Sequence, residues 1–323
     1  MKALQILGVH SFDIVDVELA KPREDQATVQ IEIVSTCPRW DMHMMGGKDM
    51  MDASKSPEYP LPPGWPGHEM AGTVVAVGSQ VNGLKVGDRV AALEHIGGYG
   101  AYAQFLNYKE DELIVLPDSI SWKQAVSFEL LKCVLIGLRQ FGDLQGRSML
   151  ISGLGPAGML ALQAAKLLGA SDVTAVDINR DCVRFVNELQ LGTAIHSDDL
   201  GDTRFDMGYD CVGAAASVQY VLDRVDDHVV IFGVLKGEVH YGANLWLKGT
   251  KLESYRYRRF DATDRELLLD LVGNRNLNTE CLQTHHIPFY RYGETVDLLS
   301  RQEAIKVYAF PAVDFVKAGK EGR

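Results

Sequence analysis

The stretch that most constrains the fold is Met149–Asp177, in which an apolar run leads into a glycine-rich turn and an uncharged helical segment. The run Met149–Ile151 predicts a buried strand. Pro156 suits a first helical turn, so we expect a helix from there to about Leu168. A second apolar strand, Val173–Val176, follows and ends on an acid. Strand, turn, helix and strand in this order predict an α/β unit with a parallel sheet.

The turn itself reads Gly153-Leu154-Gly155-Pro156-Ala157-Gly158, a G-x-G-x-x-G pattern. Gly153 permits a tight turn, Gly155 lets the backbone approach a pyrophosphate, and Gly158 lets the helix lie close to the strand. The free N–H groups at the start of the helix favour phosphate. Asp177, about 20 residues further on, is placed to bind the adenosine ribose. The pattern predicts a dinucleotide site; a turn that binds nothing is the alternative.

Asp177 also bears on which dinucleotide is bound. Its carboxylate would repel a 2′-phosphate, which favours NAD over NADP, although Arg180 and Arg184 follow closely. Ligands of parallel sheets lie at the carboxyl ends of the strands. We therefore expect Val212 and Phe232-Gly233-Val234, which end two later strands, to approach the cofactor.

Composition limits the classes of partner. The chain has 323 residues, enough for two domains, and a net charge of −11, which argues against nucleic acid or an anionic membrane. The N-terminus is not expected to be a signal peptide. The odd number of cysteines without a C-x-x-C pattern fits a reducing, cytoplasmic setting rather than a disulfide framework. The cysteines are Cys37, Cys133, Cys182, Cys211 and Cys281.

The chain changes character near residue 120. Residues 1–110 predict a β-rich region with strands at Thr28–Val34, Ala71–Val77 and Tyr99–Leu106, and a long loop at Cys37–Pro66. After this region strands alternate with helices, as in a parallel sheet covered on both faces. We expect the tail, with helices at Thr263–Val272 and Tyr292–Ser300 and a strand at Lys306–Phe310, to pack back on the first domain.

Four residues outside the turn are candidates for metal chemistry. They are Cys37, His68, the adjacent Glu69, and Glu129. A thiolate, an imidazole and a carboxylate with one open position are the ligand set of a catalytic zinc, which activates a bound alcohol. These residues lie far apart in sequence, so a buried cysteine and a satisfied loop histidine are the alternative.

From about Thr28 to Phe310 the chain resembles the medium-chain dehydrogenase/reductase superfamily, in its zinc-dependent alcohol and polyol dehydrogenase branch (sorbitol- or threonine-dehydrogenase-like). The resemblance implies an α/β protein. A GroES-like β-rich catalytic domain, residues 1–120 completed by 258–323, would join a doubly wound Rossmann domain, residues 121–257. It also implies that zinc and NAD meet in the cleft between the domains. The matching residues are Cys37, Pro66–Val74, Val86–Val90, Gly153–Gly158, Asp177 and Lys306-Val307.

The resemblance also suggests roles. The family's zinc ligands map onto Cys37 and His68. Glu69 matches a residue that is a ligand in polyol dehydrogenases and a neighbour of zinc in other members. Glu129 resembles an acid that polyol-type members carry in place of a cysteine.

The sequence departs from the family after Cys37. Pro38-Arg39-Trp40-Asp41 follows, one residue longer than usual and without the hydroxyl that begins a proton relay. We expect His43 or a bound water to take over the relay. Asp41 is expected either to bind the far nitrogen of His68 or to form a loop turn. Arg39 and Trp40 would bind an acidic or sugar-like substrate or pack the loop.

A second departure is the absence of cysteine from Val90–Phe105, where a structural-zinc lobe would lie. We therefore expect one catalytic zinc and no structural zinc. The sequence predicts a cytoplasmic homodimer or homotetramer that transfers hydride between NAD and a small alcohol or ketone of polyol, sugar or cyclitol type. A zinc-free NAD(P)H-dependent quinone or enoyl-type reductase and a catalytically lapsed NAD-binding protein are the alternatives.

Overall fold

The computed structural model describes residues 1–52, 54–94 and 100–315, and the chain divides into two compact units. One unit joins Met1–Leu130 to the segment that begins at Thr279, and the other is Leu131–Asn278. The second unit thus begins and ends later than the expected Rossmann boundaries, 121–257. Over the described residues, no helix is both long and apolar enough to cross a membrane.

The second unit alternates strands with helices, as its sequence predicts. Its strands are β8 (Ser148–Ser152), β9 (Asp172–Asp177), β10 (Thr193–His196), β11 (Phe205–Asp210), β12 (Val225–Ile231) and β13 (Lys251–Ser254). Its helices are α4 (Pro156–Leu167), α5 (Arg180–Glu188), η2 (Ser197–Asp199), α6 (Ala215–Arg224), α7 (Ala243–Lys248) and α8 (Ala262–Gly273), with most of α3 (Phe128–Arg139).

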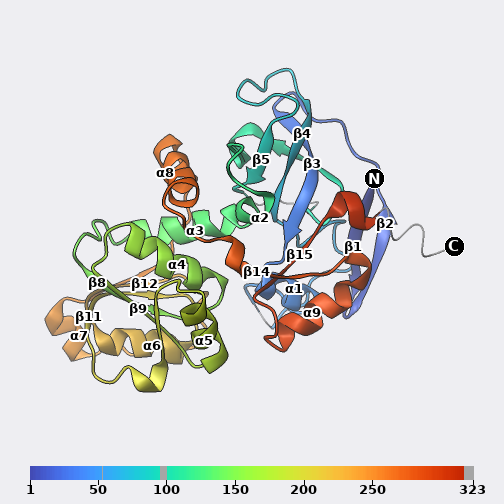
Figure 1. Ribbon diagram of the computed structural model, residues 1–323. Helices are drawn as coiled ribbons and strands as arrows, with labels where there is room; N and C mark the ends of the chain where they lie inside the picture. Colours follow the sequence, from blue (N-terminus) through green and yellow to red (C-terminus); the bar gives the residue numbers. More distant parts are fainter. Residues whose placement is uncertain (53, 95–99, 316–323) are drawn as a thin grey trace. The chain divides into compact units, whose positions relative to one another are not determined.

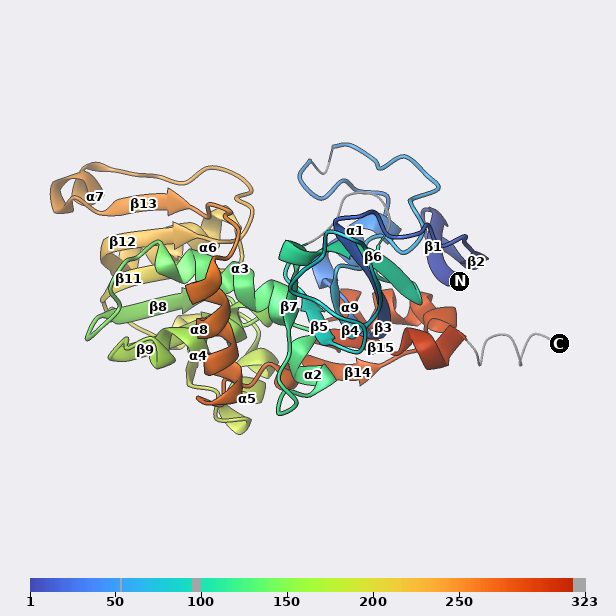
Figure 2. The ribbon, with the colours of Figure 1, turned by 90° about the horizontal axis from the view of Figure 1, so that it is seen from above.

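The sheet of this unit is parallel, in the order β10-β9-β8-β11-β12-β13 (Figure 2). The chain starts at β8 in the middle, winds outward to β10, and then continues from β11 to the other edge. This is a doubly wound Rossmann sheet, which confirms the predicted fold class. Its order reverses between β8 and β11, and Leu150, Val176 and Val229 lie in the core beneath.

Helix α8 belongs to this second unit, although residues from 258 onward were expected in the first. Asp264 explains the difference. Its carboxylate is almost fully buried and forms ion pairs with Arg139 of α3 and with Arg258. Because a buried charge is costly without partners, these pairs hold α8 against α3.

The first unit is mostly β-structure. Its strands are β1 (Lys2–Gly8), β2 (Ser11–Asp16), β3 (Gln26–Ser35), β4 (Glu69–Val77), β5 (Arg89–Ala92), β6 (Phe105–Lys109), β7 (Leu113–Val115), β14 (Gln283–His286) and β15 (Lys306–Ala309). Its helices are α1 (Pro38–Met45), η1 (Glu110–Glu112), α2 (Trp122–Ala125), η3 (Glu280–Leu282), η4 (Phe289–Arg291) and α9 (Tyr292–Ser300).

Strand β3 organises this unit. It pairs with β4, β6 and β15, in a sheet whose described strands run β14-β15-β3-β4-β5-β7. The C-terminal segment completes the unit: β15 extends the sheet, and α9 lies against α1 (Figure 1). Both segments fill one core, in which Leu4 and Ile31 share a cluster with Phe289 and Tyr292. The first unit is therefore discontinuous in sequence.

The first unit differs from the sequence expectations at one loop and one strand. The predicted loop Cys37–Pro66 contains helix α1, because Pro38 can occupy the first helical position without losing a hydrogen bond. The strand expected at Tyr99–Leu106 is observed as β6, Phe105–Lys109, while Tyr99 lies outside the described residues.

Candidate functional site

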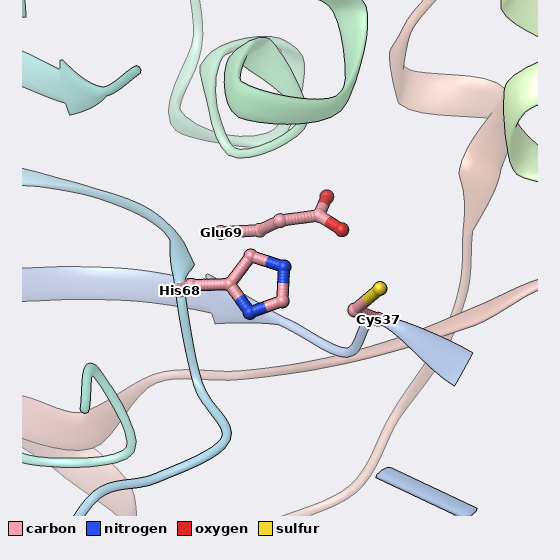
Figure 3. Close-up of side chains that lie close together, drawn as sticks. All are labelled: Cys37, His68 and Glu69. Carbon is pink, nitrogen blue, oxygen red and sulfur yellow. The ribbon is translucent and has the colours of Figure 1, made fainter. Parts of the chain in front are cut away.

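The pairing of β3 with β4 brings Cys37, His68 and Glu69 together. Ser35 at the end of β3 lies opposite Glu69 at the start of β4. Cys37 follows Ser35 by two residues, and His68 immediately precedes β4, so all three lie at one end of the strand pair. One potential ligand atom from each lies within 4.8 Å of the other two. Figure 3 shows the sulfur, the carboxylate and a ring nitrogen of His68 facing a common space.

His68 is buried and held in one orientation. Its Nδ1 lies 2.8 Å from the carbonyl oxygen of Pro66, an acceptor, so Nδ1 carries a proton and Nε2 faces the cluster. Nε2 lies 3.9 Å from Oε2 of Glu129, in the first turn of α3. Burial lowers the pKa of His68, but the hydrogen bond and charge of Cys37, with the carboxylates of Glu129 and Glu69, raise it to about 10. The same negative charge attracts a metal cation.

Glu69 has one oxygen engaged and one that lacks a partner. Its Oε1 forms a buried ion pair with the ammonium group of Lys306, which also donates a hydrogen bond of 2.6 Å to the carbonyl oxygen of Thr36. Its Oε2 is buried and has no hydrogen-bond partner among the described residues. Burial raises the pKa of Glu69, against the opposing charge of Lys306. A cation would supply the partner that Oε2 lacks.

Asp41 does not contact the far nitrogen of His68, because Pro66 occupies that nitrogen. The first turn of α1 directs the Asp41 carboxylate back toward Cys37, whose N–H donates to Oδ2 at 2.9 Å. The hydroxyls of Tyr102 and Tyr292 donate to Oδ1 at 2.6 and 2.5 Å. Burial raises the pKa of Asp41, and these bonds oppose the rise. Asp41 therefore fixes the backbone of Cys37.

His43 lies on α1 but outside the cluster found among the described residues. Its Nδ1 is 3.1 Å from the carbonyl oxygen of Asp49. Lys306 was expected only as a family match, and Tyr102 and Tyr292 were not predicted as site residues. A lysine inside an apolar strand was a signal for a buried ion pair; nothing in the local sequence marks the two tyrosines.

In the second unit, the glycine turn has the expected conformation. Gly153 has φ +93°, in the region that favours glycine. A Cβ on Gly158 would lie 1.7 Å from the carbonyl oxygen of Gly153, so only glycine permits this approach of α4 to the turn. A Cβ on Gly155 would meet nothing within 4 Å, which leaves room beside the turn. Pro156 is the first residue of α4.

Asp177 closes this turn from the end of β9. Its Oδ2 accepts a hydrogen bond of 2.6 Å from the N–H of Leu154, and its Oδ1 accepts one of 2.8 Å from Asn179. Each carboxylate oxygen has a further lone pair for a ribose hydroxyl. The two arginines that follow form ion pairs. Arg180 lies 2.9 Å from the carboxylate of Asp199, and Arg184 lies 2.8 Å from that of Asp181.

The other predicted cofactor residues lie at the carboxyl ends of β11 and β12. Val212 is partly exposed and packs beside Gly153, because a Cβ there would lie 2.6 Å from its Cγ2. Gly233 approaches Gly213 so closely that a Cβ would lie 2.3 Å from the Gly213 nitrogen. Phe232 and Val234 flank this contact and are half-buried. The two strand ends thus meet beside the glycine turn.

Comparisons with known proteins agree with this architecture. The model of the alcohol dehydrogenase GroES-like domain matches residues 23–118. A 2-methylene-furan-3-one reductase of Solanum lycopersicum is 31% identical over 253 residues, which span 73% of this chain and 63% of that protein. An L-threonine 3-dehydrogenase of Photorhabdus laumondii is 27% identical over 274 residues, which span 72% and 77% of the two chains.

Among solved structures, galactitol-1-phosphate dehydrogenase of Escherichia coli superposes with a TM-score of 0.82 at 20% identity. The superposition covers 96% of this chain and 100% of that chain. At this identity, the likeness establishes the fold.

Proposed function

Because the chain belongs to the medium-chain dehydrogenase superfamily, we propose that it is a zinc-dependent, NAD-linked dehydrogenase. Its substrate is a secondary alcohol of polyol, sugar or cyclitol type, or the corresponding ketone in reverse. The observation that carries the proposal is the cluster of half-buried Cys37 with buried His68 and Glu69, in which Oε2 of Glu69 has no hydrogen-bond partner among the described residues. L-threonine, named for the Photorhabdus relative, is itself a secondary alcohol.

The donor set fits zinc, since it combines a thiolate, an imidazole and a carboxylate. Cys37, His68 and Glu69 would hold the metal, with Glu129 beside them as a further carboxylate. When bound, the metal lowers the pKa of an alcohol and stabilises the alkoxide. The carbonyl of Pro66 orients the His68 ring, which fixes the tautomer that presents Nε2.

Two further residues position these ligands. Lys306 engages Oε1 of Glu69, which leaves Oε2 as the oxygen that would bind a metal. Asp41 accepts a hydrogen bond from the N–H of Cys37 and thereby fixes the backbone that carries the thiolate. The hydroxyl proton leaves to water or through His43, whose Nδ1 faces the carbonyl of Asp49.

The turn Gly153–Gly158 and Asp177 would bind the dinucleotide, through backbone N–H groups and the ribose hydroxyls. When bound there, the dinucleotide would supply the hydride acceptor for oxidation of the alcohol to the ketone. Two features support NAD over NADP: the carboxylate of Asp177, and the ion pairs that engage Arg180 and Arg184. Exposed ion pairs are weak, so Asp177 carries most of this preference.

Elemental analysis tests the proposal directly, on protein purified without chelator or affinity metal. We expect about one zinc per chain in the wild type, as for a single catalytic site, and none in Cys37→Ser. Cys182→Ser, a half-buried cysteine on α5, is the matched control and should keep its zinc. Full NAD-linked turnover by zinc-free Cys37→Ser would overturn the mechanism.

A second candidate is a zinc-free NADPH-dependent reductase of activated double bonds, favoured by the 31% identity to the tomato furanone reductase. The buried cluster and the carboxylate of Asp177 argue against it. Activity that survives chelation and prefers NADPH would establish this alternative in place of the first.

A further inference from the structure

The last residue of β11, Asp210, is fully buried in the second unit. Its Oδ2 accepts a hydrogen bond of 2.6 Å from the N–H of Gly213, and its Oδ1 accepts one of 2.5 Å from the hydroxyl of Ser217. The oxygen of that hydroxyl lies 2.7 Å from the hydroxyl of Ser152, the last residue of β8, which therefore donates to it. Donors thus face both carboxylate oxygens, as an ionised carboxylate requires.

This buried carboxylate has only neutral partners. In the parts of the chain that the structure describes, Asp210 forms no ion pair, and its donors are the Ser217 hydroxyl and the N–H groups of Val212 and Gly213. Burial raises the pKa of Asp210, and these hydrogen bonds oppose the rise. Burial and the Asp210 charge together raise the pKa of the adjacent Cys211 thiol. A cation that approached this carboxylate would therefore be stabilised by it.

The position of Asp210 in the sheet indicates which ligand group would approach it. Strand β11 lies between β8 and β12, and the strand order reverses between β8 and β11 (Figure 2). Dinucleotides bind outside the carboxyl ends of the strands at such a reversal. The glycine turn after β8 and Asp177 at the end of β9 suit the pyrophosphate and the adenosine ribose. The other half of the dinucleotide, which carries the nicotinamide, is then directed to the ends of β11 and β12.

Asp210 connects the strand ends on which this half would lie. Its carbonyl oxygen accepts hydrogen bonds of 2.8 and 3.1 Å from the N–H groups of Phe232 and Gly233, which follow β12. Cys211, the next residue, packs against the glycine turn, because a Cβ on Gly153 would lie 3.7 Å from the Cβ of Cys211. Asp210 therefore lies below the three strand ends that border the expected cofactor site.

The nicotinamide ring carries a positive charge in NAD and none in NADH, while the rest of the two molecules is the same. A fixed negative charge below the ring favours the oxidised form, since only that form gains from the attraction. We propose that Asp210 makes this site bind NAD in preference to NADH and so lowers the reduction potential of the bound cofactor. This inference rests on the proposed dehydrogenase function, of which it uses only the binding of the dinucleotide.

The test is the ratio of two dissociation constants, Kd for NADH over Kd for NAD, measured by calorimetric titration without substrate. Asp210→Asn keeps the shape of the side chain and removes its charge. We expect the ratio to fall roughly tenfold, as for two unit charges about 10 Å apart at an effective dielectric constant of about 20. Asp206→Asn, a partly exposed aspartate near the other end of β11, is the matched control and should keep the wild-type ratio. Partial unfolding of a variant weakens both affinities by the same factor, so it cancels in the ratio.

Two substitutions of Ser217 separate the charge of Asp210 from its hydrogen bonds. Ser217→Ala removes one donor and leaves the carboxylate, so the ratio should stay near that of the wild type. Ser217→Lys places an ammonium group beside Asp210 and cancels its charge, so the ratio should fall as it does for Asp210→Asn. This variant leaves Asp210 itself intact, and it tests the inference even if Asp210→Asn does not fold.

The possible outcomes separate this inference from the proposed function. An equal loss of both affinities in Asp210→Asn, with an unchanged ratio, would overturn the inference, because Asp210 would then only hold the backbone in place. A wild type that binds neither NAD nor NADH would overturn the inference and the proposed function together. The expected fall in the ratio, found in a protein that oxidises no alcohol, would support the inference and remove the proposed dehydrogenase activity.

Discussion

Lys306 is fully buried and neutralises a buried carboxylate, so its substitution should strongly destabilise the first unit. Lys306→Met leaves Glu69 charged and unpaired, so we expect the free energy of unfolding to fall by about 3–5 kcal/mol. Urea denaturation of metal-free protein measures this loss. Glu69→Gln combined with Lys306→Met removes both charges and should recover most of the stability.

The matched control is Lys85→Met, which breaks an ion pair with Asp88 in which the lysine side chain is 85% exposed. Exposed pairs contribute about 0–1 kcal/mol, so this variant should unfold almost as the wild type does. If both lysine variants lost the same stability, Lys306 would not be compensating a buried charge.

At the scale of the element, two glycines in the turn between β8 and α4 are expected to serve different purposes. Gly158 should matter for stability, and Gly155 for binding of the dinucleotide. Gly158→Ala places a methyl group 1.7 Å from a backbone oxygen, so α4 must move away, and we expect a loss of about 2 kcal/mol or more. Gly155→Ala meets no protein atom and should cost less than about 1 kcal/mol, the scale of a helix-cap change. Its methyl group instead fills the room beside the turn, so NAD affinity should fall.

Thermal unfolding and NAD titration of the two variants distinguish these effects. Unchanged NAD affinity in Gly155→Ala would show that the dinucleotide does not approach this turn. Unchanged stability in Gly158→Ala would show that α4 can retreat without loss.

Elements with a strong local pattern were predictable from sequence. Met149–Asp177 gave strand, turn, helix and strand close to their observed positions, because apolar periodicity and glycine act over a few residues. The helix inside the Cys37–Pro66 loop was missed, since it has only 8 residues and lies in a stretch rich in Met, Pro and Gly. Helix α8 was expected in the other unit. The ion pair that holds it joins Asp264 to Arg139, which lies far away in the chain and could not be paired with it from local sequence.

The same distinction holds within the site. Residue types and family resemblance singled out Cys37, His68 and Glu69, and strand pairing places them together. The partners that orient them could not be found in this way. Tyr292 reaches Asp41 across 251 positions of sequence, and such a contact follows only from the assembled fold.

At the scale of the whole molecule, the two units differ in continuity, and this predicts how fragments behave. The second unit is one segment with a complete sheet and its own core, which includes Leu150, Val218 and Val229. We expect a fragment of residues 127–278, which keeps α3 intact, to unfold cooperatively in urea and to bind NAD. A fragment ending at 278 that starts at residue 1 lacks Phe289 and Tyr292, which fill the core of the first unit. That fragment should show the transition of the second unit alone and bind no zinc. A cooperative first unit in the shortened chain would mean that β15 and α9 are dispensable, against their place in the sheet and core.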